Sequence, residues 1–195
     1  NLKNKWVKHD EPEHHLNNLT NLIIKNTSIT KKSEIIGISY KDKSFLNRFK
    51  IRGFKNTRIL SYPKKNNDKN HYSLIDLAQK RFSTSKINVQ KNNFSRIIVC
   101  RHILEHSTNI KLFINSLNSI ARINDYILIE IPTADKFLKN NNFTMIWEEH
   151  RFYFKYKNFI NILKMLNFKI VFKKIYSYPY EDCCVALISK NNNKK

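Results

Sequence analysis

Short runs of strand length alternate with amphipathic segments of helical length along most of this chain. The strand-like runs span residues 34–39, 57–61, 96–100 and 126–131, and helical apolar spacing marks residues 44–52, 74–82, 108–122 and 157–166. Apolar side chains that recur every three to four residues indicate helices, whereas a short unbroken apolar run suits a strand buried on both faces. This alternation predicts βαβ units, and therefore an α/β protein whose mainly parallel central sheet carries helices on both faces.

The two ends of the chain depart from this alternation. Strand-like residues 168–176 and 183–189 flank a Tyr-Pro-Tyr turn with no helix between them, which predicts an antiparallel hairpin at one edge of the sheet. Near the start, Leu16, Leu19, Leu22 and Ile23 share one helix face, with Asp10 as a candidate N-cap. We therefore expect an N-terminal helical segment over residues 1–30, one domain over residues 31–190, and a polar disordered tail over residues 191–195.

The net charge of +21 is large, and either a polyanionic partner or the base composition of the genome could account for it. Excess lysine attracts polyanions, including nucleic acids. Lysine, asparagine and isoleucine are all abundant while glycine falls to 2 residues, which is the pattern of an AT-rich genome. No RRM, zinc-finger or KH signature accompanies the charge. Nucleic-acid binding therefore stays the weaker expectation.

Two further patterns concern location. No apolar run approaches the roughly 18 residues that a membrane span requires, and no signal-peptide pattern is present. The 3 cysteines include no CxxC pair and form no disulfide framework. These patterns predict a protein of the reducing cytoplasm that has no membrane partner.

Polar residues follow the run at 96–100 in the order RHILEH. Open α/β sheets bind ligands outside the carboxyl ends of their strands, so Arg101 and His102 are predicted to face a ligand. The spacing HxxEH also occurs in zinc proteases, where two histidines on one helix hold the metal. Here the motif follows a strand directly, so no metal is predicted. An alternative makes Glu105 and His106 a local hydrogen-bonding pair.

A second polar cluster, Glu148-Glu149-His150-Arg151, lies within the segment WEEHRFYF. A carboxylate beside an imidazole can orient the ring and raise its basicity, which a general base requires. Flanking aromatic side chains, from Trp147 to Phe154, would exclude water from such a site. A solvated loop is the competing interpretation.

Gly37 ends the first predicted strand in a chain that has few glycines. A glycine at this place permits either close approach of a ligand or a tight packing contact within the protein. The loop that follows it lacks the glycine-rich fingerprint of nucleotide-binding proteins, so by itself it indicates no cofactor.

Four segments taken in order, RHILEH, IEIP, WEEHRFYF and YPYEDCCVALI, resemble class I S-adenosylmethionine-dependent methyltransferases. More narrowly, they are similar to the sugar C-methyltransferase-like branch of that family. The resemblance covers nearly the whole chain, from about residue 33 to residue 190. It implies a Rossmann-like fold, S-adenosylmethionine as the cofactor, and C-methylation of a nucleotide-linked keto-deoxysugar or a related saccharide precursor.

The resemblance also implies roles for single residues. Cofactor-binding positions are Gly37, Ile38, Ser39, Tyr40, Asp42, Ser61, Cys100, Arg101 and His102. Ser61 stands where the family usually carries an acidic residue for the ribose hydroxyls. Glu149 and His150 match a catalytic Glu-His pair, and Trp147 and Arg151 fall at substrate positions.

These roles suggest a mechanism. His150, oriented by Glu149, would remove the acidic proton beside the keto group, and His102 or Arg101 would stabilise the enolate oxygen. The carbanion would then attack the sulfonium methyl group, and lysines around the site would suit a substrate diphosphate. Two alternatives stay open. One is a catalytically degenerate methyltransferase-like interaction domain, which Ser61 and the glycine-poor loop favour. The other is a basic RNA-binding or RNA-modifying protein, although the Asn/Asp-Pro-Pro-Tyr type of motif is absent.

Overall fold

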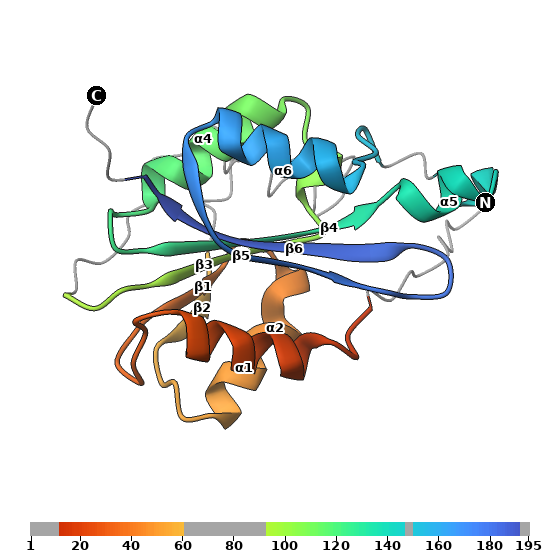
Figure 1. Cartoon of the computed structure of the whole chain (residues 1–195). Helices are drawn as coiled ribbons and strands as arrows, with labels where there is room; N and C mark the ends of the chain where they lie inside the picture. The colour runs from red at the N-terminus through yellow and green to blue at the C-terminus, as the bar shows by residue number, and fades with distance from the viewer. Residues whose placement is uncertain (1–11, 61–92, 147–149, 192–195) are drawn as a thin grey trace, which may run out of the picture.

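A six-stranded mixed sheet with helices on both faces forms the centre of the structure (Figure 1). The computed structural model describes residues 12–60, 93–146 and 150–191. Within these ranges the strand order is β2-β1-β3-β4-β6-β5. The strands are β1 (Ile35–Gly37), β2 (Thr57–Ile59), β3 (Ile97–Arg101), β4 (Tyr126–Thr133), β5 (Phe168–Tyr176) and β6 (Asp182–Lys190). The predicted helix at 74–82 lies outside the described residues.

The parallel half of the sheet winds outward from β1 in two directions. β1 pairs in parallel with β2 on one side and with β3 on the other, and β3 pairs in parallel with β4. The order of the strands therefore reverses between β1 and β3. Ligands of doubly wound sheets bind at such a switch point, outside the carboxyl ends of the strands. The residues that follow β1 and β3 are therefore the candidates for a ligand site.

The last two strands form the predicted antiparallel hairpin. β5 pairs with β6, and β6 pairs antiparallel with β4, so β5 is the edge strand. The predicted α/β fold with an antiparallel edge is therefore confirmed.

The bounds of β4 differ from the prediction, because the strand continues through Pro132 to Thr133. The carbonyl of Glu130 faces β3 and accepts the His102 amide, so Pro132, two residues on, presents its missing N–H on that same side. β3 has already ended opposite Glu130. Proline at this place therefore removes no hydrogen bond of the sheet.

Two hydrophobic layers hold the helices against the sheet. Helices α1 (Leu16–Asn26) and α2 (Lys43–Ile51) cover one face, and α4 (Ile110–Ile120) and α6 (Tyr156–Met165) cover the other (Figure 1). Alternation along β3 feeds both layers, since Ile97 and Val99 pack with α1 and α2 while Ile98 and Cys100 pack with α4 and α6. The N-terminal helix therefore shares a core with the sheet.

Helix ends follow local sequence. α2 ends before Gly53, whose φ of 85° is the left-handed conformation that favours glycine. α4 begins after Asn109, whose side chain accepts the Leu112 amide as an N-cap. α1 begins at Leu16 after His15, whereas Asp10, the predicted cap, lies outside the described residues. A short helix, α5 (Asp135–Lys139), follows β4 and was not predicted.

Across the described ranges, no helix combines the length and the apolar character needed to cross a membrane.

Candidate functional site

The carboxylate of Asp42 joins the carboxyl ends of β1 and β3 at the switch point. Asp42 ends a short 3₁₀ helix (Tyr40–Asp42), and its side chain is fully buried. The backbone N–H of Ser39 donates to Oδ2 at 2.9 Å, and the backbone N–H of Arg101 donates to Oδ1 at 3.2 Å. Two backbone donors that could otherwise face a ligand are therefore satisfied by the protein itself.

Gly37 is explained by this carboxylate. A Cβ at position 37 would lie 2.7 Å from the Cβ of Asp42, a distance that real side chains do not tolerate. The glycine thus permits a tight packing contact inside the loop, which was one of its two predicted interpretations. Burial raises the pKa of Asp42 from its ordinary 3.8 to about 7, although the hydrogen bonds from Ser39 and Arg101 lower it.

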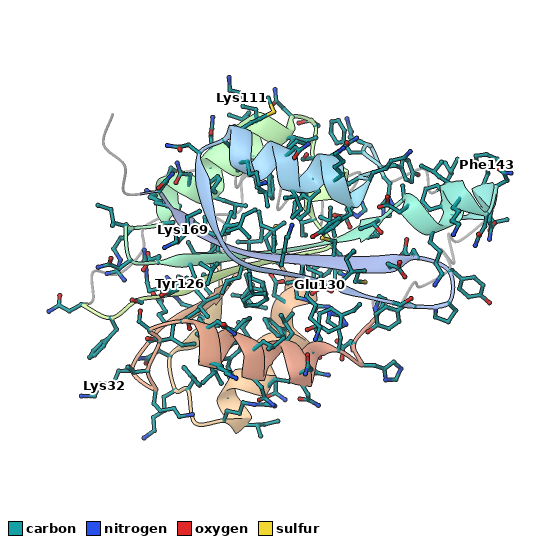
Figure 2. All side chains as sticks on the ribbon, viewed as in Figure 1. Lys32, Lys111, Tyr126, Glu130, Phe143 and Lys169 are labelled. Atoms are coloured by element: carbon teal, nitrogen blue, oxygen red, sulfur yellow. The ribbon has the colours of Figure 1, made fainter. Side chains whose placement is uncertain are left out.

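A second buried carboxylate, Glu130 of β4, lies on the face of the sheet that α1 covers (Figure 2). Three basic side chains contact it. Arg101 binds it through two hydrogen bonds, from Nε to Oε2 at 2.8 Å and from Nη2 to Oε1 at 3.2 Å. His102 Nε2 lies 2.9 Å from Oε1, and His15 Nε2 lies 3.3 Å from the same oxygen. Burial raises the pKa of Glu130, but Arg101, His102 and His15 outweigh burial and hold it well below its usual range.

His15 reaches this network from the residue that precedes α1. Its ring nitrogen Nδ1 lies 2.6 Å from the hydroxyl of Tyr178, in the turn between β5 and β6. The backbone N–H of His15 donates to the same hydroxyl at 3.2 Å. The Tyr178 hydroxyl therefore holds the His15 ring in place, with Nε2 on the side of Glu130.

The chain leaves β3 through a sharp turn at His102, whose φ of 49° lies in the left-handed region. A 3₁₀ helix (Leu104–His106) follows at once. His102 and His106 therefore do not share a helix face, as they would in a zinc-protease motif. His102 turns toward Glu130 instead, and its Nδ1 lies 3.7 Å from Oε1 of Glu105.

The segment that contains His150 packs against this 3₁₀ helix through its backbone. The amides of Arg151 and Phe152 both donate to the carbonyl of Glu105, at 2.9 and 3.0 Å. Further on, Phe154 pairs with Thr133 in a parallel bridge beyond the end of β3. These contacts hold His150 next to the HILEH segment.

Glu105, His106 and His150 form a compact cluster at this junction. One potential ligand atom from each of these side chains lies within 4.8 Å of the other two. The imidazoles of His106 and His150 meet edge to face, with ring centroids 4.8 Å apart and an angle of 84° between their planes. Burial raises the pKa of Glu105, but the neighbouring imidazoles of His102, His106 and His150 hold it below its ordinary value.

The structure brings together only part of the predicted site. His150 lies in one group with Glu105 and His106, and Glu105 also lies 3.7 Å from His102. Arg101 and His102 are each 1% exposed, so the Glu130 network covers both side chains. Cys100 lies in the core beneath α4 and α6, and burial raises the pKa of its thiol well above the usual range. Ser61, Trp147 and Glu149 lie outside the described residues.

The remaining predicted positions differ in their exposure. Ile38 and Ser39 are buried where the chain leaves β1, and Tyr40 is half exposed. Arg151 is exposed beside His150.

Four residues of the site were not predicted as functional. They are His15, Glu105, His106 and Glu130. The HILEH spacing drew attention to Glu105 and His106, and Glu130 is the acidic residue of IEIP. A charged residue within a strand that is otherwise apolar was the available signal for Glu130, because burial of a carboxylate requires partners. No comparable signal marks His15, a lone histidine before a helix.

The fold is similar to that of several solved methyltransferases. The 1,6-didemethyltoxoflavin-N1-methyltransferase of Burkholderia thailandensis, solved with 1,6-didemethyltoxoflavin and S-adenosylhomocysteine, matches with a TM-score of 0.56 and 11% identity. The match covers 92% of this chain and 78% of that one. A SAM-dependent methyltransferase from Aquifex aeolicus matches with a TM-score of 0.52 and 8% identity, over 92% of this chain and 93% of that one.

Magnesium protoporphyrin IX methyltransferase from Synechocystis, solved with S-adenosylhomocysteine, matches with a TM-score of 0.51 and 7% identity. This match covers 90% of this chain and 82% of that chain. No protein-family model matches the sequence. No curated protein matches it either. The chain therefore has the Rossmann-like fold of these methyltransferases, as predicted.

Proposed function

We propose that this chain is an S-adenosylmethionine-dependent methyltransferase. The observation that carries the proposal is the likeness of nearly the whole fold to methyltransferases, two of which hold S-adenosylhomocysteine in their structures. Two features of this chain support it. The loops after β1 and β3 meet at the switch point, where doubly wound sheets bind ligands. A group of imidazoles with a buried carboxylate lies beside the end of β3.

For the acceptor, we propose a nucleotide-linked keto-deoxysugar that is methylated on carbon. The sequence resemblance supports this class of acceptor, and the position of His150 supports a base next to the cofactor site. His150 is half-buried, and the Tyr153 ring lies near it, with a centroid distance of 5.8 Å. Imidazoles in such partly dry sites are suited to proton transfer near neutral pH.

In the proposed reaction, His150 takes the proton from the carbon beside the keto group, and the electron pair moves to the keto oxygen as an enolate. That carbon then forms a bond with the methyl group of the cofactor. The bond between the methyl carbon and sulfur breaks, and its electron pair stays on sulfur. We propose that Arg101 and His102, which are paired with Glu130, fix the end of β3 from inside. Glu149 keeps its predicted role of orienting His150.

Calorimetric titration with S-adenosylmethionine and S-adenosylhomocysteine tests the first proposal. We expect binding of one molecule of either ligand, with a dissociation constant in the micromolar range, about −8 kcal/mol. Adenosine triphosphate serves as a control for general attraction of anions by a protein of charge +21. Absence of heat with both cofactor forms, at a protein concentration near 100 μM, would remove the methyltransferase proposal.

The base assignment is tested by His150→Ala, with His14→Ala as the matched control at an exposed histidine. Methyl transfer to a nucleotide-diphosphate keto-deoxysugar should fall at least about 100-fold in the first variant, the usual contribution of a general base. Cofactor affinity should change less than about twofold in either variant, because His150 is not among the predicted cofactor positions. Normal turnover by the His150 variant would show that another group takes the proton.

One observation favours a second candidate, a methyltransferase-like domain that has no catalytic activity. Asp42 occupies the backbone donors of Ser39 and Arg101 at the switch point, and its bulk fills the space beside Gly37. In this candidate the loop is closed by the protein's own carboxylate. The same titration separates the two candidates, because the closed loop predicts no cofactor binding.

A further inference from the structure

Glu105, His106 and His150 come from two segments that the fold joins rigidly. The first two residues belong to the 3₁₀ helix after β3, and the third belongs to the segment that precedes α6. The two hydrogen bonds from Arg151 and Phe152 to the Glu105 carbonyl fix the distance between the segments. The closeness of the three side chains is therefore built into the backbone.

The Glu105 carboxylate is buried and accepts no hydrogen bond from the described residues. The residue is 1% exposed, and neither of its oxygens has a hydrogen-bond partner among the residues that the structure describes. His102 Nδ1 lies 3.7 Å from Oε1, which is too far for a hydrogen bond. Burial removes water from this charge, and the imidazoles of His102, His106 and His150 compensate for that loss, because they hold the pKa of Glu105 below its ordinary value. A cation between the carboxylate and the imidazoles of His106 and His150 would bind oxygens that accept no hydrogen bond from the described residues.

We propose that Glu105, His106 and His150 bind one divalent transition-metal ion of the zinc type. Two imidazoles and one carboxylate are ligands that zinc prefers, and three protein ligands leave a fourth position open. Zinc lies about 2.0–2.2 Å from such ligands, so tetrahedral ligand atoms are roughly 3.4 Å apart. The ligand atoms of the three side chains lie within 4.8 Å of one another, so shifts of less than about 1 Å in each side chain would bring them to that spacing.

The other group with suitable ligand types is His102, Glu130 and Cys183. Two facts weigh against it. Glu130 is already bound by Arg101 and His102 through hydrogen bonds. Burial raises the pKa of Cys183, whereas a metal needs the thiolate. The proposed site also differs from the HxxEH pattern, because it uses His150 in place of His102.

Metal binding at this cluster would affect the proposed methyl transfer. A nitrogen lone pair of His150 that is donated to a metal cannot take a proton, so a bound ion and general-base catalysis exclude each other. This consequence rests on the proposed function, whereas binding of the ion rests on the geometry alone. Metal binding is therefore tested without cofactor or acceptor, so its failure and the failure of the proposed function are distinguishable.

The test is titration of the metal-free full chain with Zn²⁺ by calorimetry and with Co²⁺ by visible absorption. We expect one ion per chain and d–d bands of a low-coordinate cobalt site with nitrogen and oxygen ligands. Glu105→Gln, His106→Ala and His150→Ala should each weaken Zn²⁺ binding at least about tenfold. Cys183→Ser and His14→Ala should leave it unchanged, since the first removes the rival group and the second an exposed histidine.

Two results would overturn the proposal. One is absence of Zn²⁺ binding by the wild-type chain at micromolar concentrations. The other is a strong thiolate-to-cobalt charge-transfer band that disappears in Cys183→Ser, which would place the ion at the rival group. Even if a ligand variant fails to fold, the cobalt spectrum of the wild-type chain distinguishes the proposed site from the rival group that contains Cys183.

Discussion

Asp42 shows how one side chain can close a loop that glycines usually shape. Its two oxygens accept amides from Ser39 and Arg101, which belong to the ends of two different strands. Gly37 permits the approach by lacking a Cβ. A loop without the glycine-rich fingerprint can therefore still turn sharply at the end of β1. The buried carboxylate accepts the backbone N–H groups that a bound phosphate would accept in a glycine-rich loop.

The raised pKa of Asp42 makes stability depend on pH. The pKa is about 7 in the folded protein and 3.8 ordinarily, so the folded state holds a proton that the unfolded state releases. This contribution is fully present below pH 3.8 and is lost as the pH rises through 7. Between pH 5 and pH 8 the free energy of unfolding should fall by about 3 kcal/mol from this group.

Urea unfolding of the wild type and of Asp42→Asn at both pH values measures this contribution. The variant should be less stable at pH 5, because the amide nitrogen of the replacement cannot accept a hydrogen bond. It should also lose less stability than the wild type as the pH rises. The other ionisable groups are the same in both proteins, so only the difference between the two profiles is informative. Parallel profiles would show that Asp42 is ionised throughout.

At the scale of elements, strand ends and the segments beyond them build the site. β4 extends past the end of β3, and the segment around Phe154 pairs with the part of β4 that lies beyond β3. This pairing brings His150 to the HILEH segment. On the other face of the sheet, Glu130 connects β3, β4 and the start of α1 through Arg101, His102 and His15.

Glu130→Gln tests how strongly that network holds these elements together. The change leaves the buried Arg101 guanidinium without a full counter-charge, so the free energy of unfolding should fall by roughly 3–5 kcal/mol. Glu13→Gln is the matched control, since the Glu13 side chain is 43% exposed in its ion pair with Arg48 and should cost less than about 1 kcal/mol. Denaturant unfolding measures both values. Equal losses in the two variants would indicate that the buried network contributes little.

For the whole molecule, the prediction succeeded where the signal is local and periodic. The apolar runs and helical spacing located β1, β3, β4, α2, α4, α6 and the C-terminal hairpin within a few residues. The site was predicted in part. The HILEH and WEEHRFYF segments were both singled out, and the contact of His150 with Glu105 and His106 was not predicted. The predicted pairing of His150 with Glu149 stays a prediction, because residue 149 lies outside the described residues.

The difference has a physical reason. Binary patterns of apolar and polar side chains determine which segments become helices and strands, because burial of apolar surface drives the fold. The sequence by itself therefore determined the α/β architecture, the antiparallel edge and the strand ends at which polar residues gather. Only the tertiary structure decided the partners of those residues. Arg101 and His102 bind Glu130 inside the protein, and His150 lies beside Glu105. A buried charge pairs with the group that packing places within reach, and the sequence pattern does not specify that group.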